Sequence, residues 1–190
     1  MRFSKTKLAI FAAWTICAQS TARSQSAKDS LQPLVETSAQ RLLIAERVAL
    51  AKWDSGMPVE DRSREAQIIE HAITAGESKG LNQAAVSNFF RAQIEANKLI
   101  QYSLLAEWRR AGKAPDHKSV NLPNAIRPEL DQLETALIEE LAKTEGIRAS
   151  ASCHSDVAKA VGTFVSSTTT KFSPLRRIAL DRALAAACTD

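Results

Sequence analysis

The chain has 190 residues, of which 45% are hydrophobic and 24% charged, with only six glycines and six prolines. This length suits one sizeable core and a single domain. The low glycine and proline content and the abundance of Ala, Leu, Glu, Lys and Arg favour an all-α fold, and no alternating strand pattern of useful length argues for a sheet.

The first 22 residues have the pattern of an export signal. Three basic residues precede an apolar run over residues 8–18, and small residues follow between positions 20 and 27. We expect cleavage near Ala22, which makes 23–190 the mature chain of a periplasmic or secreted protein. An uncleaved helix in the membrane interface is the alternative. The apolar run, like every later stretch, is too short to span a bilayer, so no membrane association is expected after cleavage.

The leader also accounts for most of the net charge. The chain carries 25 Lys and Arg against 21 Asp and Glu, a formal charge of +4. Three of the basic residues and none of the acidic ones lie in the leader, which leaves 22 against 21. A nucleic-acid-binding surface needs a clustered basic excess, so no nucleic-acid partner is expected.

Helical periodicity and helix-end signals predict a bundle of about six helices. The long helices are expected from Pro33 to Ser55, from Pro58 to Lys79, and from the N-cap Asn82 to Arg110. A surface loop over 111–123 separates these catalytic helices, about 30–110, from C-terminal helices within 124–190. The latter are expected over 128–144, from about 152 to 165, and over 175–188 behind the N-cap Ser173, with a polar hinge over 166–170.

Charged residues lie on the apolar face of the first of these helices. Arg41 and Lys52 are eleven positions apart, so at about 100° per residue they point within about 20° of one direction. Ala45 and Val48 lie between them on the same face. Because burial of an unpaired charge is costly, this face predicts a nearby anion. Two cations that extend along the surface to solvent are the alternative.

Amides occupy the middle of the apolar stripe on the third helix. The stripe is about 80° wide and consists of Val86, Phe90, Gln93, Asn97, Gln101, Leu104 and Trp108. Together with the cations, these amides suit a small anion that carries more than one carboxylate. A polar network between helices is the alternative for the amides, and a surface pair at i,i+3 is the alternative for Asp61 and Arg64.

The spacing of these residues resembles a known family. Arg41 and Lys52 are followed by Lys52-Trp53, Pro58-x-Glu60-Asp61-x-x-Arg64-Glu65 and Gln93-Ile94-x-Ala96-x-Lys98-x-Ile100-Gln101-Tyr102. These motifs, in this order, are similar to the secreted gamma subclass of the all-helical, type II chorismate mutases, over residues 30 to 190. The resemblance implies an isomerase of the shikimate pathway that converts chorismate to prephenate without cofactor or metal. It also implies a homodimer in which each chain holds its own complete site.

The resemblance implies a role for each matching residue. Arg41 and Arg127 match arginines that grip substrate carboxylates, and Lys52 matches the lysine on a carboxylate and the ether oxygen. Gln101 matches the second donor to that oxygen. Asp61, Arg64 and Asn97 match residues around the ring hydroxyl of the substrate. Lys52, Gln101 and Arg64 are thus the expected catalytic residues, and Val48 is expected to form apolar wall.

Two of the matching positions carry a different residue in some relatives, and a third match is supported only by a short motif. Glutamate replaces Gln101 in part of the family and must be protonated to donate, whereas Gln101 always donates, so little acid requirement is expected. Others carry Ser or Thr where this chain has Asn97. Arg127 rests only on the short context Arg127-x-x-Leu130-Asp131-x-Leu133.

The cysteines agree with export. Cys17 lies in the leader, which leaves Cys153 and Cys188. An even pair in an exported chain predicts one disulfide, with two buried thiols as the alternative; the resembling family also places a disulfide in this region. The three histidines are scattered without metal-ligand spacing, so they are interpreted as solvated or structural.

A function of another class stays open at this point. A secreted helical binding or effector protein could keep the fold and lack turnover. The set Arg41, Lys52, Arg64 and Gln101 argues against that alternative, because a binding protein has no need of donors to the ether oxygen.

Overall fold

The computed structural model describes residues 11–119, 121–168 and 172–189, with side chains from residue 27 onward. The expected leader, 1–22, lies outside the residues whose side chains are described. The elements are α1 (Phe11–Ser55), α2 (Arg62–Glu77), α3 (Gln83–Ala111), the π-helical turn η1 (Leu122–Ile126), α4 (Arg127–Lys143), α5 (Glu145–Arg148), α6 (Cys153–Ser167) and α7 (Pro174–Leu184). Within the described ranges all regular structure is helical, which confirms the all-α prediction. None of the described helices is both long and apolar enough to cross a membrane.

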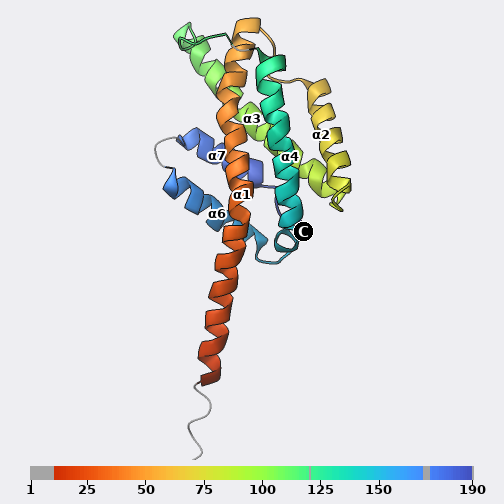
Figure 1. Ribbon diagram of the computed structural model, residues 1–190. Coiled ribbons are helices and arrows are strands. Elements are labelled where there is room, and N and C mark those ends of the chain that lie inside the picture. The colour runs from red at the N-terminus through yellow and green to blue at the C-terminus, as the bar shows by residue number, and fades with distance from the viewer. Residues whose placement is uncertain (1–10, 120, 169–171, 190) are drawn as a thin grey trace, which may run out of the picture.

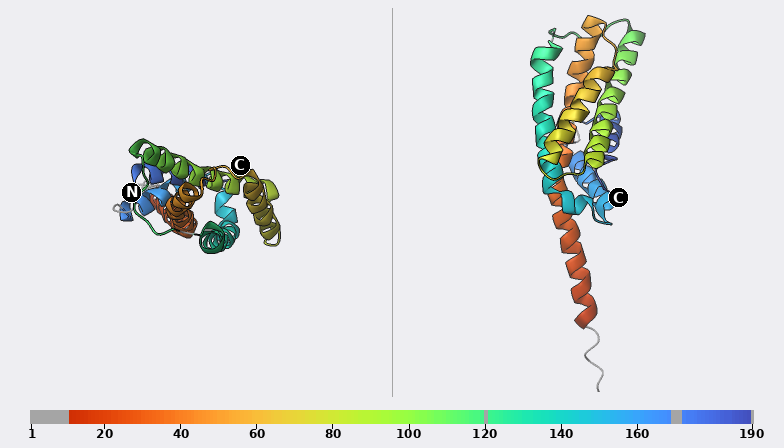
Figure 2. Two further views of the ribbon diagram at one scale, coloured as in Figure 1. Left: turned by 90° about the horizontal axis from the view of Figure 1, so that it is seen from above. Right: turned by 90° about the vertical axis from the view of Figure 1, so that its right-hand side faces the viewer.

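Helix α1 is the axis of the bundle, and its first part extends beyond the other helices (Figure 1). Helices α3, α4, α6 and α7 all contact it, and α2 lies on the far side of α3 and α4 (Figure 2). The largest fully buried side chains of the main core come from four of these helices: Leu31, Leu34, Leu42, Phe89, Phe90, Ile100, Leu137, Leu141 and Leu180. Burial of these faces in one core holds α1 and α3 side by side.

The predicted start of the first mature helix at Pro33 is wrong. Helix α1 runs through Pro33, which lies inside it. A proline inside a helix costs about 3 kcal/mol because it lacks the N–H donor and its ring crowds the preceding turn. Leu31, Leu34 and Val35 are buried in the core, and each such side chain contributes about 1.5–3 kcal/mol. Tertiary packing thus outweighs the local signal.

Side-chain caps fix the other helix starts. The predicted caps Asn82 and Ser173 are confirmed, since they accept hydrogen bonds from the N–H groups of Ala85 and Arg176. Helix α2 begins at Arg62, later than expected, because the Asp61 side chain accepts from the Arg64 N–H at 3.1 Å. Helix α7 ends at Leu184 instead of 188, where the chain turns back toward α5.

One contact of α2 with α3 requires glycine. A Cβ atom at Gly76 would lie 2.9 Å from the Cγ2 atom of Val86, closer than side-chain atoms approach one another. The absence of a side chain at Gly76 thus lets α2 lie close against α3. Both helices carry residues of the candidate site.

The expected loop after α3 is pinned to the end of α1. The His117 ring donates to the carbonyl oxygen of Pro115 at 2.8 Å, and its Nε2 atom lies 3.1 Å from Asp54. The hydrogen bond to Pro115, followed by the one to Asp54, raises the pKa of His117. His117 is thus structural, as expected, and the loop leads from this anchor into η1.

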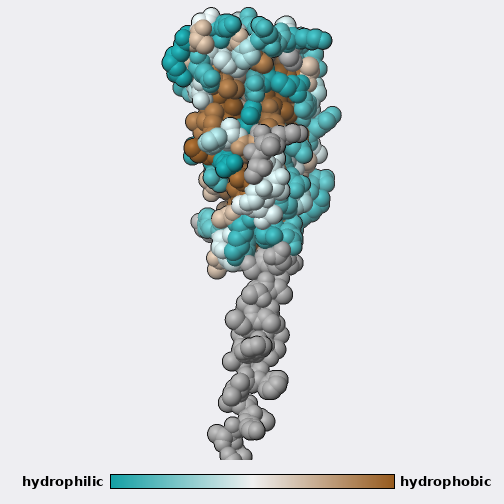
Figure 3. All heavy atoms as spheres, turned by 90° about the vertical axis from the view of Figure 1, so that its left-hand side faces the viewer, coloured by the Kyte–Doolittle hydropathy of each residue, from teal (hydrophilic) through white to brown (hydrophobic). Residues whose placement is uncertain are grey.

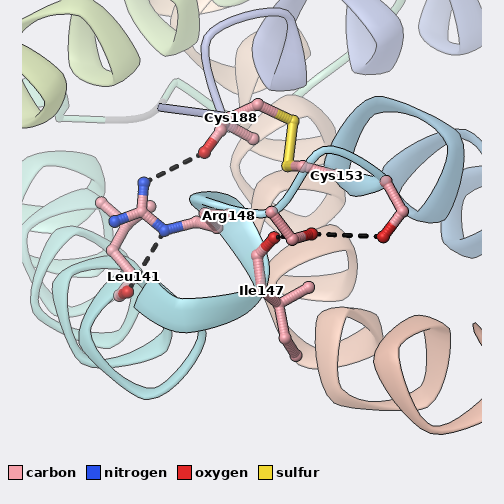
Figure 4. The surroundings of a disulfide bond; sticks show 8 residues. Leu141, Ile147, Arg148, Cys153 and Cys188 are labelled. Atoms are coloured by element: carbon pink, nitrogen blue, oxygen red, sulfur yellow. Dashed lines mark hydrogen bonds between the residues drawn. A yellow bond between two sulfur atoms is a disulfide. The ribbon is translucent and has the colours of Figure 1, made fainter. Parts of the chain in front are cut away.

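The predicted disulfide between Cys153 and Cys188 is confirmed, with 5.8 Å between the Cα atoms. It joins the start of α6 to the end of the described chain (Figure 4). Beside it, buried Arg148 donates to the carbonyl oxygens of Leu141 at 3.3 Å and Ala187 at 3.0 Å. The bridge and this guanidinium tie the segment after α7 to α5 and α6.

Removal of the disulfide is expected to destabilise the protein. The bridge closes a separation of 35 residues, for which loss of chain entropy in the unfolded state predicts about 3–4 kcal/mol. The variant with both cysteines replaced by serine should lose about that free energy of unfolding in urea titrations. A reductant should have no effect on the variant. A wild-type protein equally stable with and without reductant would contradict the expectation.

Candidate active site

One cavity gathers all of the predicted site residues. It measures about 710 Å³ with its mouth included, and α1, α2, α3, η1, α4 and the segment before α2 contribute to it. The predicted residues that line it are Arg41, Lys52, Asp61, Arg64, Asn97, Gln101 and Arg127. Val48 is part of its apolar wall, as expected, together with Val59, Ile68, Ile94, Leu122 and Leu130. Residues from distant parts of the chain thus meet at one place.

Arg41 and Lys52 of α1 are buried and have no carboxylate within ion-pair distance among the described residues. Arg41 is 4% and Lys52 8% exposed, and the face that they share with Ala45 and Val48 is the buried one, as predicted. Neither forms an ion pair within 4 Å in the part of the chain that the structure describes, and the buried Nε atom of Arg41 has no hydrogen-bond partner there. Such groups require an anion, because an uncompensated buried charge is costly.

The same burial changes the acidity of both groups. Loss of solvation is the largest cause that lowers the pKa of Arg41, and the carboxylates of Glu134 and Asp131 oppose it. Loss of solvation likewise lowers the pKa of Lys52, against Asp61 and Glu65. The Lys52 Nζ atom donates to the carbonyl oxygen of Val59 at 2.6 Å. This bond fixes the direction of the ammonium group and leaves two of its three N–H donors for a ligand.

Two other predicted residues are arginines that already face carboxylates. An Nη atom of Arg64 lies 2.7 Å from an Asp131 oxygen on α4, and an Nη atom of Arg127 lies 3.8 Å from Asp61. The surface pair considered for Asp61 and Arg64 is replaced by a cap on the backbone, which leaves the Arg64 side chain free to reach across the cavity mouth. Both guanidinium groups thus belong to the cavity lining and face carboxylates that also line it.

The three amides in the apolar stripe of α3 bind different partners. Gln93 donates to Ser38 at 2.9 Å and to the carbonyl oxygen of Ala183 at 3.1 Å, so it belongs to a network between helices. Asn97 donates to the carbonyl oxygen of Arg41 at 3.0 Å, and Gln101 donates to Asn97 at 2.7 Å. Asn97 and Gln101 lie in the lining of the cavity, and Gln93 does not.

Four charged residues of the cavity were not among the predicted site residues: Glu65, Lys98, Asp131 and Glu134. Lys98 is paired with Glu65 at 3.3 Å and with Glu95 at 2.7 Å. Glu134 lies one turn from Leu130 and from Ile138, on the apolar face of α4, and is 9% exposed. A carboxylate on an apolar helix face is the same signal that singles out Arg41 and Lys52, so it was available in the sequence.

Glu134 is expected to lower stability as it ionises. Burial is the largest cause that raises its pKa above the ordinary 4.5, and Arg41 opposes this less strongly. The folded state then binds more protons than the unfolded state, so stability falls as pH rises through and above 4.5. The stability gain of Glu134→Gln over wild type should therefore grow from about pH 4 to about pH 7 in urea titrations. Glu139→Gln, at an exposed ion pair with Lys79, is the control, and a gain for Glu134→Gln that is independent of pH would contradict the expectation.

Known proteins share both the sequence and the fold. Residues 32–102 match the family model described as chorismate mutase type II. The chain is 29% identical to the secreted chorismate mutase of Mycolicibacterium smegmatis over 158 residues. This alignment covers 83% of the present chain and 86% of the relative. It is 33% identical over 104 residues, or 55% of each chain, to the secreted chorismate mutase of Yersinia pestis.

Solved structures agree over nearly their whole length. The chorismate mutase of Burkholderia phymatum matches with a TM-score of 0.81 at 42% identity, over 87% of this chain and 99% of that one. The chorismate mutase of Burkholderia thailandensis matches with a TM-score of 0.78 at 33% identity, over 84% and 99% of the two chains.

The helical bundle and its cavity define an all-helical protein whose cavity is lined by buried cations and amides. The 42% identity across almost the entire Burkholderia phymatum chain makes the assignment more specific. The chain belongs to the chorismate mutase family.

Proposed function

We propose that the protein is an exported chorismate mutase that rearranges chorismate to prephenate in the cavity between α1, α2, α3 and α4. One observation carries the proposal: Arg41 and Lys52 are buried without a carboxylate partner among the described residues, in the same cavity as the amide of Gln101. A dianion is the ligand that satisfies two such cations. Family membership makes chorismate that dianion.

The reaction defines what the site has to supply. Within one molecule the ether C–O bond breaks while a C–C bond forms, so no group is transferred to another molecule and the overall oxidation state is unchanged. A protein accelerates such a step by holding the reactive conformer and by matching the charge of the transition state. Negative charge develops on the ether oxygen, and fixed donors aimed at it in a dry cavity are the most effective means.

Lys52 and Gln101 are the proposed donors to the ether oxygen. The Lys52 ammonium is held by the carbonyl of Val59, and the Gln101 amide by Asn97. Each retains at least one N–H after these contacts. Because both groups are oriented before the substrate binds, they need no reorganisation in the transition state.

The remaining residues are proposed to hold the two carboxylates and the ring hydroxyl. Arg41 and Arg127 present planar guanidinium groups, which suit carboxylates. Arg64 and Asp61 lie at the rim and are proposed to hold the hydroxyl, with Arg64 among the catalytic residues. Asp131 of α4 pairs with the Arg64 guanidinium at 2.7 Å. The charges of Glu134 and Asp131 act on Arg41 from beyond ion-pair distance.

Export and assembly belong to the same proposal. Relatives from three genera are named as secreted enzymes, which supports the export of this chain. We propose that residues 1–22 are a cleaved signal peptide and that 23–190 form one chorismate mutase domain that acts in the periplasm or outside the cell. Figure 3 shows apolar residues gathered on one face of the bundle with hydrophilic residues around them. Such a face supports the proposed homodimer, because exposed apolar patches commonly mark interfaces.

Turnover by the purified mature chain tests the function. Chorismate absorbance should fall in a saturable manner and prephenate should accumulate, without an added cofactor. The rate is expected to vary little from about pH 5 to about pH 8, since the Gln101 amide donates at every pH. A chain that shows the helical circular dichroism of the bundle but no turnover would favour a helical binding protein, and a steep gain below about pH 6 would contradict the role of Gln101.

A further inference from the structure

A chain of two hydrogen bonds connects α3 with α1 beneath the cavity. Gln101 donates from Nε2 to the Oδ1 atom of Asn97 at 2.7 Å, and Asn97 donates from Nδ2 to the carbonyl oxygen of Arg41 at 3.0 Å. Gln101, Asn97 and Arg41 are 4%, 8% and 4% exposed. Buried hydrogen bonds of this kind keep one geometry, because breaking one leaves a polar group without water or another partner.

The main chain sets the direction of both bonds. The carbonyl of Arg41 can only accept, so Asn97 must turn its NH₂ group toward it. The Oδ1 atom of Asn97 then faces Gln101, and Gln101 must in turn present its own NH₂ group. A flip of the Asn97 amide would place acceptor against acceptor at Arg41 and donor against donor at Gln101.

This direction matters because Gln101 shares the cavity with Arg41, Lys52 and Lys98. A freely rotating amide beside such cations is drawn to turn its oxygen toward them. The Oε1 atom of Gln101 is buried and accepts no hydrogen bond from any described residue. The hydrogen bond to Asn97 thus prevents the Gln101 amide from turning its oxygen toward the cations. One N–H of Gln101 binds Asn97, and the other is left for a ligand.

We propose that Asn97 is a positioning residue. Its hydrogen bond to the carbonyl of Arg41 fixes its own amide, which in turn keeps the Gln101 amide in its donating orientation. This inference rests on the proposed function. It assigns Asn97 a second task besides the substrate contact that the family resemblance implies. Both polar ends of its amide are already engaged within the protein, which favours the positioning role.

A double-mutant cycle separates the two roles. Asn97→Leu keeps the branching pattern of the side chain and removes both hydrogen bonds, so kcat should fall about tenfold or more while KM changes little. Gln101→Leu should lower kcat further. If Asn97 acts through Gln101, the double variant should be no slower than Gln101→Leu alone. Additive losses, a raised KM with unchanged kcat, or no effect of Asn97→Leu would each overturn the proposal.

The isosteric variant Asn97→Asp adds a readout that a merely structural role would not move. Both forms of the new side chain can accept from Gln101. The ionised carboxylate repels the Arg41 carbonyl and loses that anchor to α1, whereas the protonated acid donates to the carbonyl and keeps it. Burial favours the protonated form, and the cations Arg41, Lys52 and Lys98 that share the cavity favour the carboxylate. The variant should therefore regain kcat as pH falls, while the wild-type kcat stays flat.

Circular dichroism and thermal unfolding show whether each variant folds. If Asn97→Leu fails to fold, the acid recovery of Asn97→Asp decides the proposal alone, and its absence counts against it. If only the positioning role is wrong, the wild-type protein still turns over chorismate. If the proposed function is wrong, the wild-type protein shows no turnover at all. The two failures are thus distinguishable.

Discussion

Lys52→Ala is expected to lower kcat roughly a thousandfold or more, as loss of a preorganised donor to a developing negative charge does in a dry site. Lys52 is 8% exposed, and the carbonyl of Val59 fixes its ammonium group at 2.6 Å. No other described residue supplies a cation in the same position. Steady-state kinetics at saturating chorismate measures the loss directly.

Two further variants make the Lys52 result specific. Lys143→Ala removes an exposed lysine that pairs with Glu140 on α4, and it should leave kcat within about twofold, because changes at exposed ion pairs are worth less than about 1 kcal/mol. Lys52→Arg keeps the charge but changes the donor geometry, so it should recover only part of the rate. Wild-type kcat in Lys52→Ala would exclude this residue from the chemistry.

Arg41→Met is expected to lower kcat/KM about a hundredfold or more, because loss of one partner of a buried charge pair costs about 2–5 kcal/mol. The Arg41 side chain forms no hydrogen bond or ion pair with any residue that the structure describes. The substrate carboxylate is then its proposed partner. The loss should appear mainly as weaker binding, measured as KM and as the Kd of a dicarboxylate transition-state analogue.

Stability distinguishes this loss from misfolding. Methionine has a similar length and no charge to bury, so Arg41→Met should unfold at or above the wild-type temperature. Arg41→Lys keeps a cation opposite Glu134 but lacks the two-pronged geometry, so its KM should lie between those of wild type and Arg41→Met. Wild-type KM in Arg41→Met would contradict the assignment of Arg41 to a carboxylate.

Much of the fold was predictable because the helices are long and periodic. The caps Asn82 and Ser173 are local signals, and they mark the observed starts of α3 and α7. The start of α1 was not predictable from Pro33, because burial of neighbouring leucines decided it. The short elements η1 and α5 lack enough residues for a periodic pattern, and contacts with the rest of the bundle define them.

The predicted site residues share one cavity for a similar reason. Arg41 and Lys52 are recognisable because charge on an apolar face is unusual, and this pattern is local. Pairing across the cavity is not local: Arg64 and Asp131 are 67 positions apart, and no periodicity relates them. Even within one stripe, Gln93 and Gln101 differ in role, because two turns of α3 bring them beside different neighbours.

Arg41 serves the proposed site twice, once through its side chain and once through its carbonyl oxygen. Every amino acid supplies the carbonyl, so a replacement at this position preserves the join between α1 and α3 while it discards the guanidinium. A substitution at this position can thus remove the proposed substrate contact without removing the contact between the two helices. A lineage that changed this one codon would keep a well-folded bundle while its reaction became much weaker, which is a short evolutionary route away from the enzyme.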